Sequence, residues 1–129
     1  MSRTRASAKA AGSRFEREIA DYLAKTVDDR IDRKVKTGAK DTGDIGGIRL
    51  SPALRGGRVA VECKDYGGKL QAAQWLREAE TERGNDDAVV GLVVAKRRGI
   101  GDPGQQLVMM TVNDLVALLT GERPGEDDT

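Results

Sequence analysis

Residues 58–64 read Arg-Val-Ala-Val-Glu-Cys-Lys, and this stretch has the pattern of a β-strand that is only partly apolar. Side chains alternate between the two faces of a strand, so the valines and the cysteine share one face. The other face carries the carboxylate of Glu62 beside the ammonium of Lys64. The pattern predicts a strand that packs a core on one side and presents a charged pair on the other.

A second strand is predicted over residues 43–50, which include Gly43-Asp44-Ile45. Residues 51–57 are rich in turn formers, so the two strands should form an antiparallel hairpin. A turn centred near Leu54 brings Asp44 opposite Glu62 or Lys64, or one diagonal away, at roughly 5–8 Å. Two carboxylates at that spacing need a counter-charge, and a divalent cation with oxygen ligands is the usual one.

The composition limits the chemistry that is open to the chain. Its 129 residues fit one domain, and with 3% aromatic residues the core must consist mostly of Val, Leu, Ile and Ala. The chain has no histidine, and Cys63 is its one cysteine. An internal disulfide, ordinary zinc sites and Ser-His-Asp or Cys-His catalysis are therefore excluded. A hydrolase built from this chain would have to rely on carboxylates and a metal ion.

The two ends of the chain differ in charge. Residues 1–12 are basic, small and polar, which predicts a flexible basic arm before a single domain over residues 13–120. Residues 121–129 predict a disordered acidic tail. No stretch reaches the about 18 apolar residues of a membrane span, and no apolar run resembles a signal peptide. We therefore expect a cytoplasmic protein without a membrane partner.

A helix is predicted from Ser13 to about residue 25, with an apolar stripe along one side. Ser13 would cap its start, and Glu16 would then be the reciprocal partner in a capping box. Glu16 also flanks the apolar stripe, where its side chain could reach a site at the sheet edge. The spacing alone does not choose between Glu16 and Glu18 for such a role.

Residues 30–40 form a basic segment that alternates as an edge strand does. Its cations protect an edge from unwanted pairing, or they contact the phosphates of a nucleic acid. The candidate DNA-binding residues are Arg33, Lys34, Lys36 and Lys40. A second basic run, residues 96–98, is either a solvated turn or a further DNA contact.

The remaining segments complete an α/β pattern. Helical composition is found over residues 70–83, and a nearly continuous apolar strand follows over residues 88–95. Another strand over residues 106–112 precedes a short helix that ends near residue 119. The predicted order is αβββαβ followed by βα, which favours a mixed central sheet flanked by helices.

Three of these motifs occur in an order that is typical of one nuclease superfamily. Residues 12–18 (GSRFERE) open a helix, Asp44 follows a glycine, and Glu62-Cys63-Lys64 ends an apolar strand. This set resembles the PD-(D/E)XK nucleases over about residues 12–112. Within them the chain is most similar to the small Holliday-junction resolvases of archaeal type and their phage-encoded relatives. It departs from the pattern at Gly43, where the superfamily name has a proline.

The resemblance implies a restriction-endonuclease-like αβββαβ core and a Mg²⁺-dependent endonuclease, with Mn²⁺ as the expected substitute. It selects Glu16 over Glu18, so that the implied catalytic residues are Glu16, Asp44, Glu62 and Lys64. The implied metal ligands are Asp44, Glu62 and the main-chain carbonyl of Cys63.

The substrate implied is branched DNA, a four-way junction cut by a homodimer during DNA recombination and repair. Two alternatives remain open: a related nuclease that acts on linear, flapped or single-stranded DNA, and a DNA-binding module without catalysis.

Overall fold

The computed structural model describes residues 3–35, 38 and 40–125. These residues form an α/β fold of three α-helices, two short 3-10 helices and a five-stranded mixed sheet. In chain order the elements are α1 (Arg5–Thr26), β1 (Asp32–Arg33), β2 (Ile45–Gly46), η1 (Pro52–Leu54), β3 (Val59–Lys64), α2 (Ala72–Asn85), β4 (Val90–Ala95), η2 (Pro103–Gln105), β5 (Leu107–Met109) and α3 (Val112–Thr120). The first six of the α-helices and strands follow the predicted αβββαβ order, so the restriction-endonuclease-like fold is confirmed.

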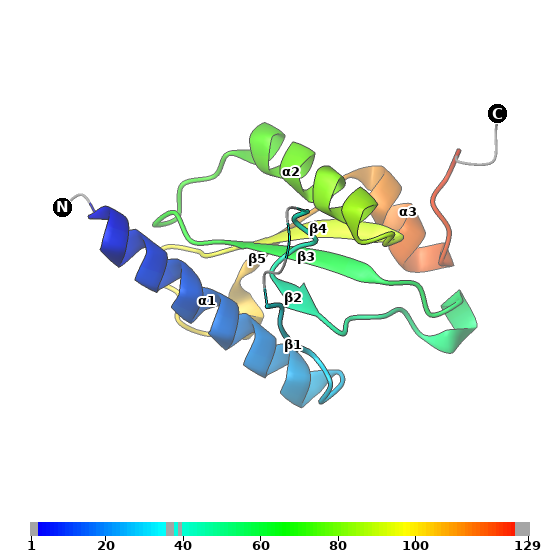
Figure 1. The fold of residues 1–129 in the computed structure, drawn as a ribbon, viewed down its shortest axis with the longest axis horizontal. Helices are drawn as coiled ribbons and strands as arrows, with labels where there is room; N and C mark the ends of the chain where they lie inside the picture. Colours follow the sequence, from blue (N-terminus) through cyan, green and yellow to red (C-terminus); the bar gives the residue numbers. More distant parts are fainter. Residues whose placement is uncertain (1–2, 36–37, 39, 126–129) are drawn as a thin grey trace.

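The strands lie in the sheet in the order of the sequence, β1 to β5 (Figure 1). β3 and β4 are parallel and are joined through α2, whereas the other neighbouring strands are antiparallel. The predicted hairpin is confirmed, because Ile45 pairs with Val61 and η1 forms the turn between β2 and β3. β2 is much shorter than predicted, although Arg49 and Arg58 form an isolated bridge beyond it.

Helices cover both faces of the sheet, with α1 and α2 on opposite sides (Figure 1). On the α1 side, Phe15 and Ile19 pack against the apolar face of β3, and Ala117 of α3 joins the same cluster. On the α2 side, Trp75 and Ala79 pack against Val93 and Ala95 of β4. The alternation predicted for residues 58–64 therefore decides which side chains of β3 face each helix.

The first helix begins earlier than the sequence predicts. α1 starts at Arg5, and Thr4 is its N-cap, with a side chain that accepts a hydrogen bond from the Ser7 N–H. The prediction of a flexible arm is therefore wrong for residues 5–12, and Ser13 does not cap a helix. The segment contains four alanines, and alanine is the best helix former. Glu16 consequently lies in a helix interior, where capping cannot explain it.

At the other end, Gly121 closes α3 in the left-handed conformation with a φ of 85°. The predicted disordered tail does not begin there, because Arg123 lies against the body of the protein. It forms an ion pair with Asp114 at 2.6 Å and donates a hydrogen bond to the Val89 carbonyl at 2.9 Å. The rest of the predicted tail, residues 126–129, lies outside the described residues. Within the described part of the chain, no helix is long and apolar enough to cross a membrane.

Candidate active site

Glu62 and Lys64 lie on the face of β3 that is covered by α2. Glu62 is 7% exposed, and Lys64 is half-buried at the end of the strand. The Lys64 ammonium donates a hydrogen bond of 2.7 Å to a carboxylate oxygen of Glu78 on α2. This hydrogen bond is the main cause that lowers the pKa of Glu78, and a second bond from Gln74 adds to it. The charged pair that the sequence predicts on one strand face is thus extended by an acid from the helix above.

The Glu62 carboxylate is one of three that come close together. One oxygen each of Asp41, Glu62 and Glu82 lie within 4.8 Å of one another. Glu82 belongs to α2 and is 4% exposed, whereas Asp41 is exposed in the segment before β2. Three converging carboxylate oxygens suit a hard divalent cation. The donor set therefore fits a magnesium-type ion.

The rotation of α2 explains why Glu82 points at the sheet. The buried residues of this helix are Trp75, Ala79 and Glu82, which are spaced at i, i+4 and i+7. These positions share one face of an α-helix. A glutamate on the buried stripe is the signal that could have identified Glu82 from the sequence. Asp41 offers no comparable signal.

Asp44 lies where β1, β2 and β3 meet. Its carboxylate accepts a hydrogen bond of 2.8 Å from the Cys63 N–H, and the side chain is buried, with 3% of the residue exposed. Its own N–H donates to the Val61 carbonyl at 2.8 Å, and its carbonyl accepts from the Lys34 N–H at 2.9 Å. Asp44 is therefore next to the end of β3, as predicted, but it is not one of the three acids that meet at Glu62.

Gly43 explains the departure from the superfamily pattern. Its φ is +100°, and a Cβ added there would lie 3.0 Å from the Val61 carbonyl oxygen. Proline fixes φ near −65°, so it cannot adopt this conformation. The chain thus reaches Asp44 through a backbone geometry that favours glycine.

Glu16 reaches the site region from α1, on the other side of the sheet. Its carboxylate accepts hydrogen bonds from Arg33 at 3.0 and 3.2 Å. Burial raises the pKa of the Cys63 thiol, the charges of Asp44 and then Glu16 raise it further, and Arg33 lowers it. The two acids are therefore near Cys63, and this thiol stays protonated and unreactive at neutral pH.

The predicted DNA-binding residues are found in different surroundings. Arg33 binds Glu16, and the Lys34 ammonium contacts Asp86 at 3.1 Å and the Thr42 carbonyl at 2.9 Å. Lys40 is exposed, and Lys36 lies outside the described residues. The charges of Arg33 in β1 and of Lys34 directly after it are thus compensated within the protein.

The predicted catalytic residues therefore fall into two groups on either side of β3. Glu62 and Lys64 face α2, and Glu16 and Asp44 lie near Cys63. Sequence reasoning missed Asp41 and Glu82, and it also missed Glu78, the partner of Lys64.

Comparison with protein families identifies this combination of fold and acidic site. Residues 7–125 match the model of a family described as "Phage putative PDDEXK endonuclease". Comparison with curated proteins and with solved structures gave no match. The chain belongs to this PDDEXK endonuclease family, which confirms the resemblance to the PD-(D/E)XK nucleases. It is thus a nuclease of a superfamily that generally depends on divalent metal ions, and the acids around Glu62 fit such an ion.

Proposed function

We propose that the protein is a Mg²⁺-dependent DNA endonuclease that resolves four-way junctions by phosphodiester hydrolysis. One observation carries the catalytic part of this proposal. On a single face of β3, the Glu62 carboxylate has two further acids within 4.8 Å, and Lys64 follows two residues later on the same face. A nuclease without histidine needs this combination of oxygen ligands and a fixed cation beside the phosphate.

Two sets of residues are candidates for holding the ion, and Glu62 belongs to both. The first set is the one implied by the superfamily, with Asp44, Glu62 and the Cys63 carbonyl. The second is the group that meets around Glu62, with Asp41 and Glu82. A bound Mg²⁺ would supply Lewis-acid polarisation of the scissile phosphate, and Mn²⁺ is expected to replace it.

Lys64 would stabilise the negative charge that develops on the phosphate in the transition state. In the structure the Lys64 ammonium donates a hydrogen bond of 2.7 Å to Glu78. A bound phosphate would therefore have to replace Glu78 as the partner of the ammonium or share the ammonium with it. Glu78 also keeps the ammonium on the α2 side of β3, which positions it beside Glu62. Glu16 would act at the other side of the strand, where its contact with Arg33 orients both side chains.

The four-way junction is the proposed substrate because of the likeness to resolvases. Symmetric resolution requires two active sites that face strands of like polarity, so a homodimer is part of the proposal. A related nuclease for linear, flapped or single-stranded DNA is the second candidate. A cationic cavity with an exposed tyrosine, next to Lys64, favours this second candidate.

A substrate panel tests the proposal. Labelled four-way junction, flap, linear duplex and single strand are incubated with the protein in Mg²⁺, in Mn²⁺ and in EDTA. We expect the junction to be cut fastest, at symmetric positions, in either metal and not in EDTA. Equal cutting of linear duplex would overturn the junction preference, and binding without cutting in any metal would leave only a DNA-binding module.

A further inference from the structure

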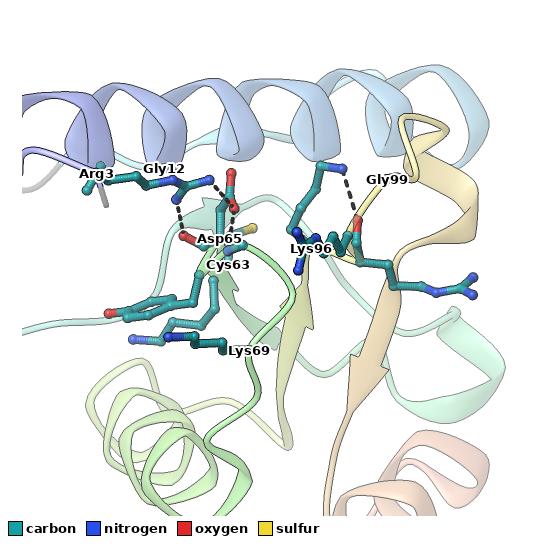
Figure 2. A pocket seen from close by; sticks show the side chains of 13 residues that line it. Arg3, Gly12, Cys63, Asp65, Lys69, Lys96 and Gly99 are labelled. Carbon is teal, nitrogen blue, oxygen red and sulfur yellow. Dashed lines mark hydrogen bonds and ion pairs between the residues drawn. The ribbon is translucent and has the colours of Figure 1, made fainter. Parts of the chain in front are cut away.

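A cationic cavity of about 890 Å³ adjoins the end of β3, and we call it the basic cavity (Figure 2). It lies between the N-terminal half of α1, the segment after β3 and the loop after β4. The side chains that line it include six cations and one acid, Asp65. The cations are Arg3, Lys64, Lys69, Lys96, Arg97 and Arg98.

In the part of the chain that the structure describes, most of this positive charge has no acidic partner. Arg3 pairs with Asp65 at 3.1 Å, and Lys64 pairs with Glu78 at 2.7 Å. Among the described residues, no carboxylate forms an ion pair with the remaining four cations, which are Lys69 and residues 96–98. Such a concentration of like charge is repulsive on its own and attracts an anion.

The positions of the cations favour a polyanion over a single small anion. They come from three separate segments, and Figure 2 shows Lys69 and Lys96 on different sides of the cavity, below α1. The Lys96 ammonium donates to the Arg97 carbonyl at 3.2 Å and also to that of Ile100, which fixes its position in the loop. Charges spread in this way match phosphates along a backbone.

An exposed aromatic ring lines the same cavity. Tyr66 is 49% exposed, and its ring contacts that of the buried Trp75, with the centroids 5.2 Å apart and the rings tilted by 52°. The Lys64 ammonium lies over the Tyr66 ring, 6.0 Å from its centroid. Cationic grooves with exposed aromatic rings are typical of proteins that bind single-stranded nucleic acid, because an unpaired base can stack on the ring. Bases inside a duplex are already stacked and cannot do so.

We infer that the basic cavity binds an unpaired DNA strand, with its phosphates on Lys69, Lys96 and Arg98 and a base on Tyr66. Lys64 and Cys63 line the cavity and also end β3, so the bound strand lies beside the candidate active site. The inference rests on the proposed function for nuclease action on DNA. Between the two candidate substrates it favours the second, DNA with unpaired nucleotides such as a flap or a single strand.

The first test measures affinity without cleavage. Binding of a labelled 12-nucleotide oligo(dT) and of a 12-base-pair duplex is followed by fluorescence anisotropy in EDTA. Tyr66→Leu should weaken single-strand binding by roughly tenfold, because loss of one stacked base has about this effect. Tyr66→Phe keeps the stacking ring and should bind within about twofold of the wild type. Equal single-strand affinity for all three proteins would overturn the stacking role.

A second test concerns the charges. Lys69→Gln and Arg98→Gln should each lower the slope of log affinity against log salt by about 0.7 for the single strand. Lys25→Gln is the control, because Lys25 is exposed near the other end of α1. Slopes that match the control would remove these cations from the binding surface.

Gly12 allows a matched pair of variants inside the cavity. It lines the cavity, and a Cβ added there meets no atom within 4 Å, so a side chain can leave the helix at this position without a clash at its first atom. Gly12→Gln and Gly12→Glu add nearly the same volume, but only the glutamate adds negative charge. Single-strand binding should be at least roughly fivefold weaker for Gly12→Glu than for Gly12→Gln, because phosphate is repelled. Equal affinity of the two variants would contradict a bound backbone.

The outcomes separate this inference from the proposed function. If Tyr66→Leu and Gly12→Glu weaken single-strand binding but no metal supports cleavage, the nuclease proposal fails and the cavity assignment stands. If metal-dependent cleavage is observed while both variants bind the single strand as the wild type does, the cavity assignment fails alone. Much tighter binding of a single-stranded RNA of the same length would overturn DNA as the ligand.

Discussion

The structure removes the helix-capping explanation that the sequence left open for Glu16. A capping role requires a helix that starts at Ser13, but α1 starts at Arg5 and Glu16 lies in its interior. Glu16 forms a partly exposed ion pair with Arg33. Such pairs contribute about 1 kcal/mol or less to stability. A functional role for Glu16 is therefore separable from its structural one.

We expect Glu16→Gln to lower cleavage steeply while the melting temperature changes little. The substitution keeps the shape of the side chain and removes the charge near Asp44 and Cys63. Single-turnover cleavage and thermal unfolding are measured together, with Glu18→Gln on the exposed face of α1 as control. Turnover equal to that of the control would show that Glu16 has a structural role and no catalytic one.

The two candidate ligand sets for the ion make different predictions for single residues. Asp44→Asn should abolish cleavage if the superfamily set holds the ion, and Glu82→Gln should do so if the acids around Glu62 hold it. Mg²⁺ affinity of each variant is measured by titration calorimetry, next to its cleavage rate. Unchanged Mg²⁺ affinity and rate in both variants would contradict both sets.

At the scale of single residues, the positions that could be predicted from the sequence are those set by the alternation of side chains along one strand. The alternation of β3 places Glu62 and Lys64 on one face, and this could be derived without a structure. Glu82 could not be placed in the same way, because its position depends on the rotation of α2 over the sheet. The left-handed backbone at Gly43 also needs the structure, since only the path of the chain past Val61 shows it.

At the scale of elements, the basic segment of residues 30–40, which includes β1, makes a prediction about DNA contact. If Lys34 and Lys40 bind phosphates, replacing either with alanine should lower the slope of log affinity against log salt by about 0.9 on duplex arms. The catalytic rate at saturating DNA should change much less, because these side chains position the substrate. Junction affinity is measured at several salt concentrations. An unchanged slope for Lys34→Ala would show that its contacts with Asp86 and Thr42 are its whole role.

α3 is held to the sheet by a buried carboxylate, and this contact makes a prediction about stability. Asp114 accepts hydrogen bonds from the Gly91 N–H at 3.0 Å, the Thr111 hydroxyl at 2.7 Å and Arg123 at 2.6 Å. Burial alone would raise the pKa of Asp114, but these hydrogen bonds together lower it below its usual value. Asp114→Asn should lower the free energy of unfolding by about 1–3 kcal/mol at pH 7, because it removes the carboxylate that pairs with Arg123 at 2.6 Å, whereas Glu80 lies farther from Arg123, at 3.7 Å.

The pH dependence of that loss follows from the lowered pKa. The stabilisation by Asp114 is present above the unfolded pKa, about 3.9, and is lost as the pH falls through the folded pKa. The difference in unfolding free energy between the wild type and Asp114→Asn should therefore shrink below about pH 4. Urea unfolding of both proteins at a series of pH values measures this difference. A difference that does not depend on pH would contradict the ionised pair.

The elements themselves were predicted to different extents. β3, β4 and α2 have strong apolar patterns and were found where the sequence places them. The start of α1 was missed because a basic, alanine-containing segment has the composition of a solvated arm, whereas Ala11 is in fact buried against the fold. β2 is short because its glycines break the extended conformation, with Gly47 at a φ of +82°.

For the whole molecule, the order of the elements was sufficient to predict the architecture. A hairpin followed by a parallel crossover through α2 fixes the positions of β2, β3 and β4, and the two remaining strands can only add at the edges. The basic cavity was not predictable, because its cations come from three distant segments. Only the packing of α1 against the ends of β3 and β4 brings them together.

The central claim is that the face of β3 under α2 is a metal-dependent active site. The most direct measurement is single-turnover cleavage of the four-way junction in Mg²⁺ by the wild type and by Glu62→Gln. The variant removes one negative charge from the group of three acids, so the account predicts a rate lower by at least roughly a hundredfold, with junction binding in EDTA equal or stronger. Wild-type turnover by a folded Glu62→Gln protein would contradict it.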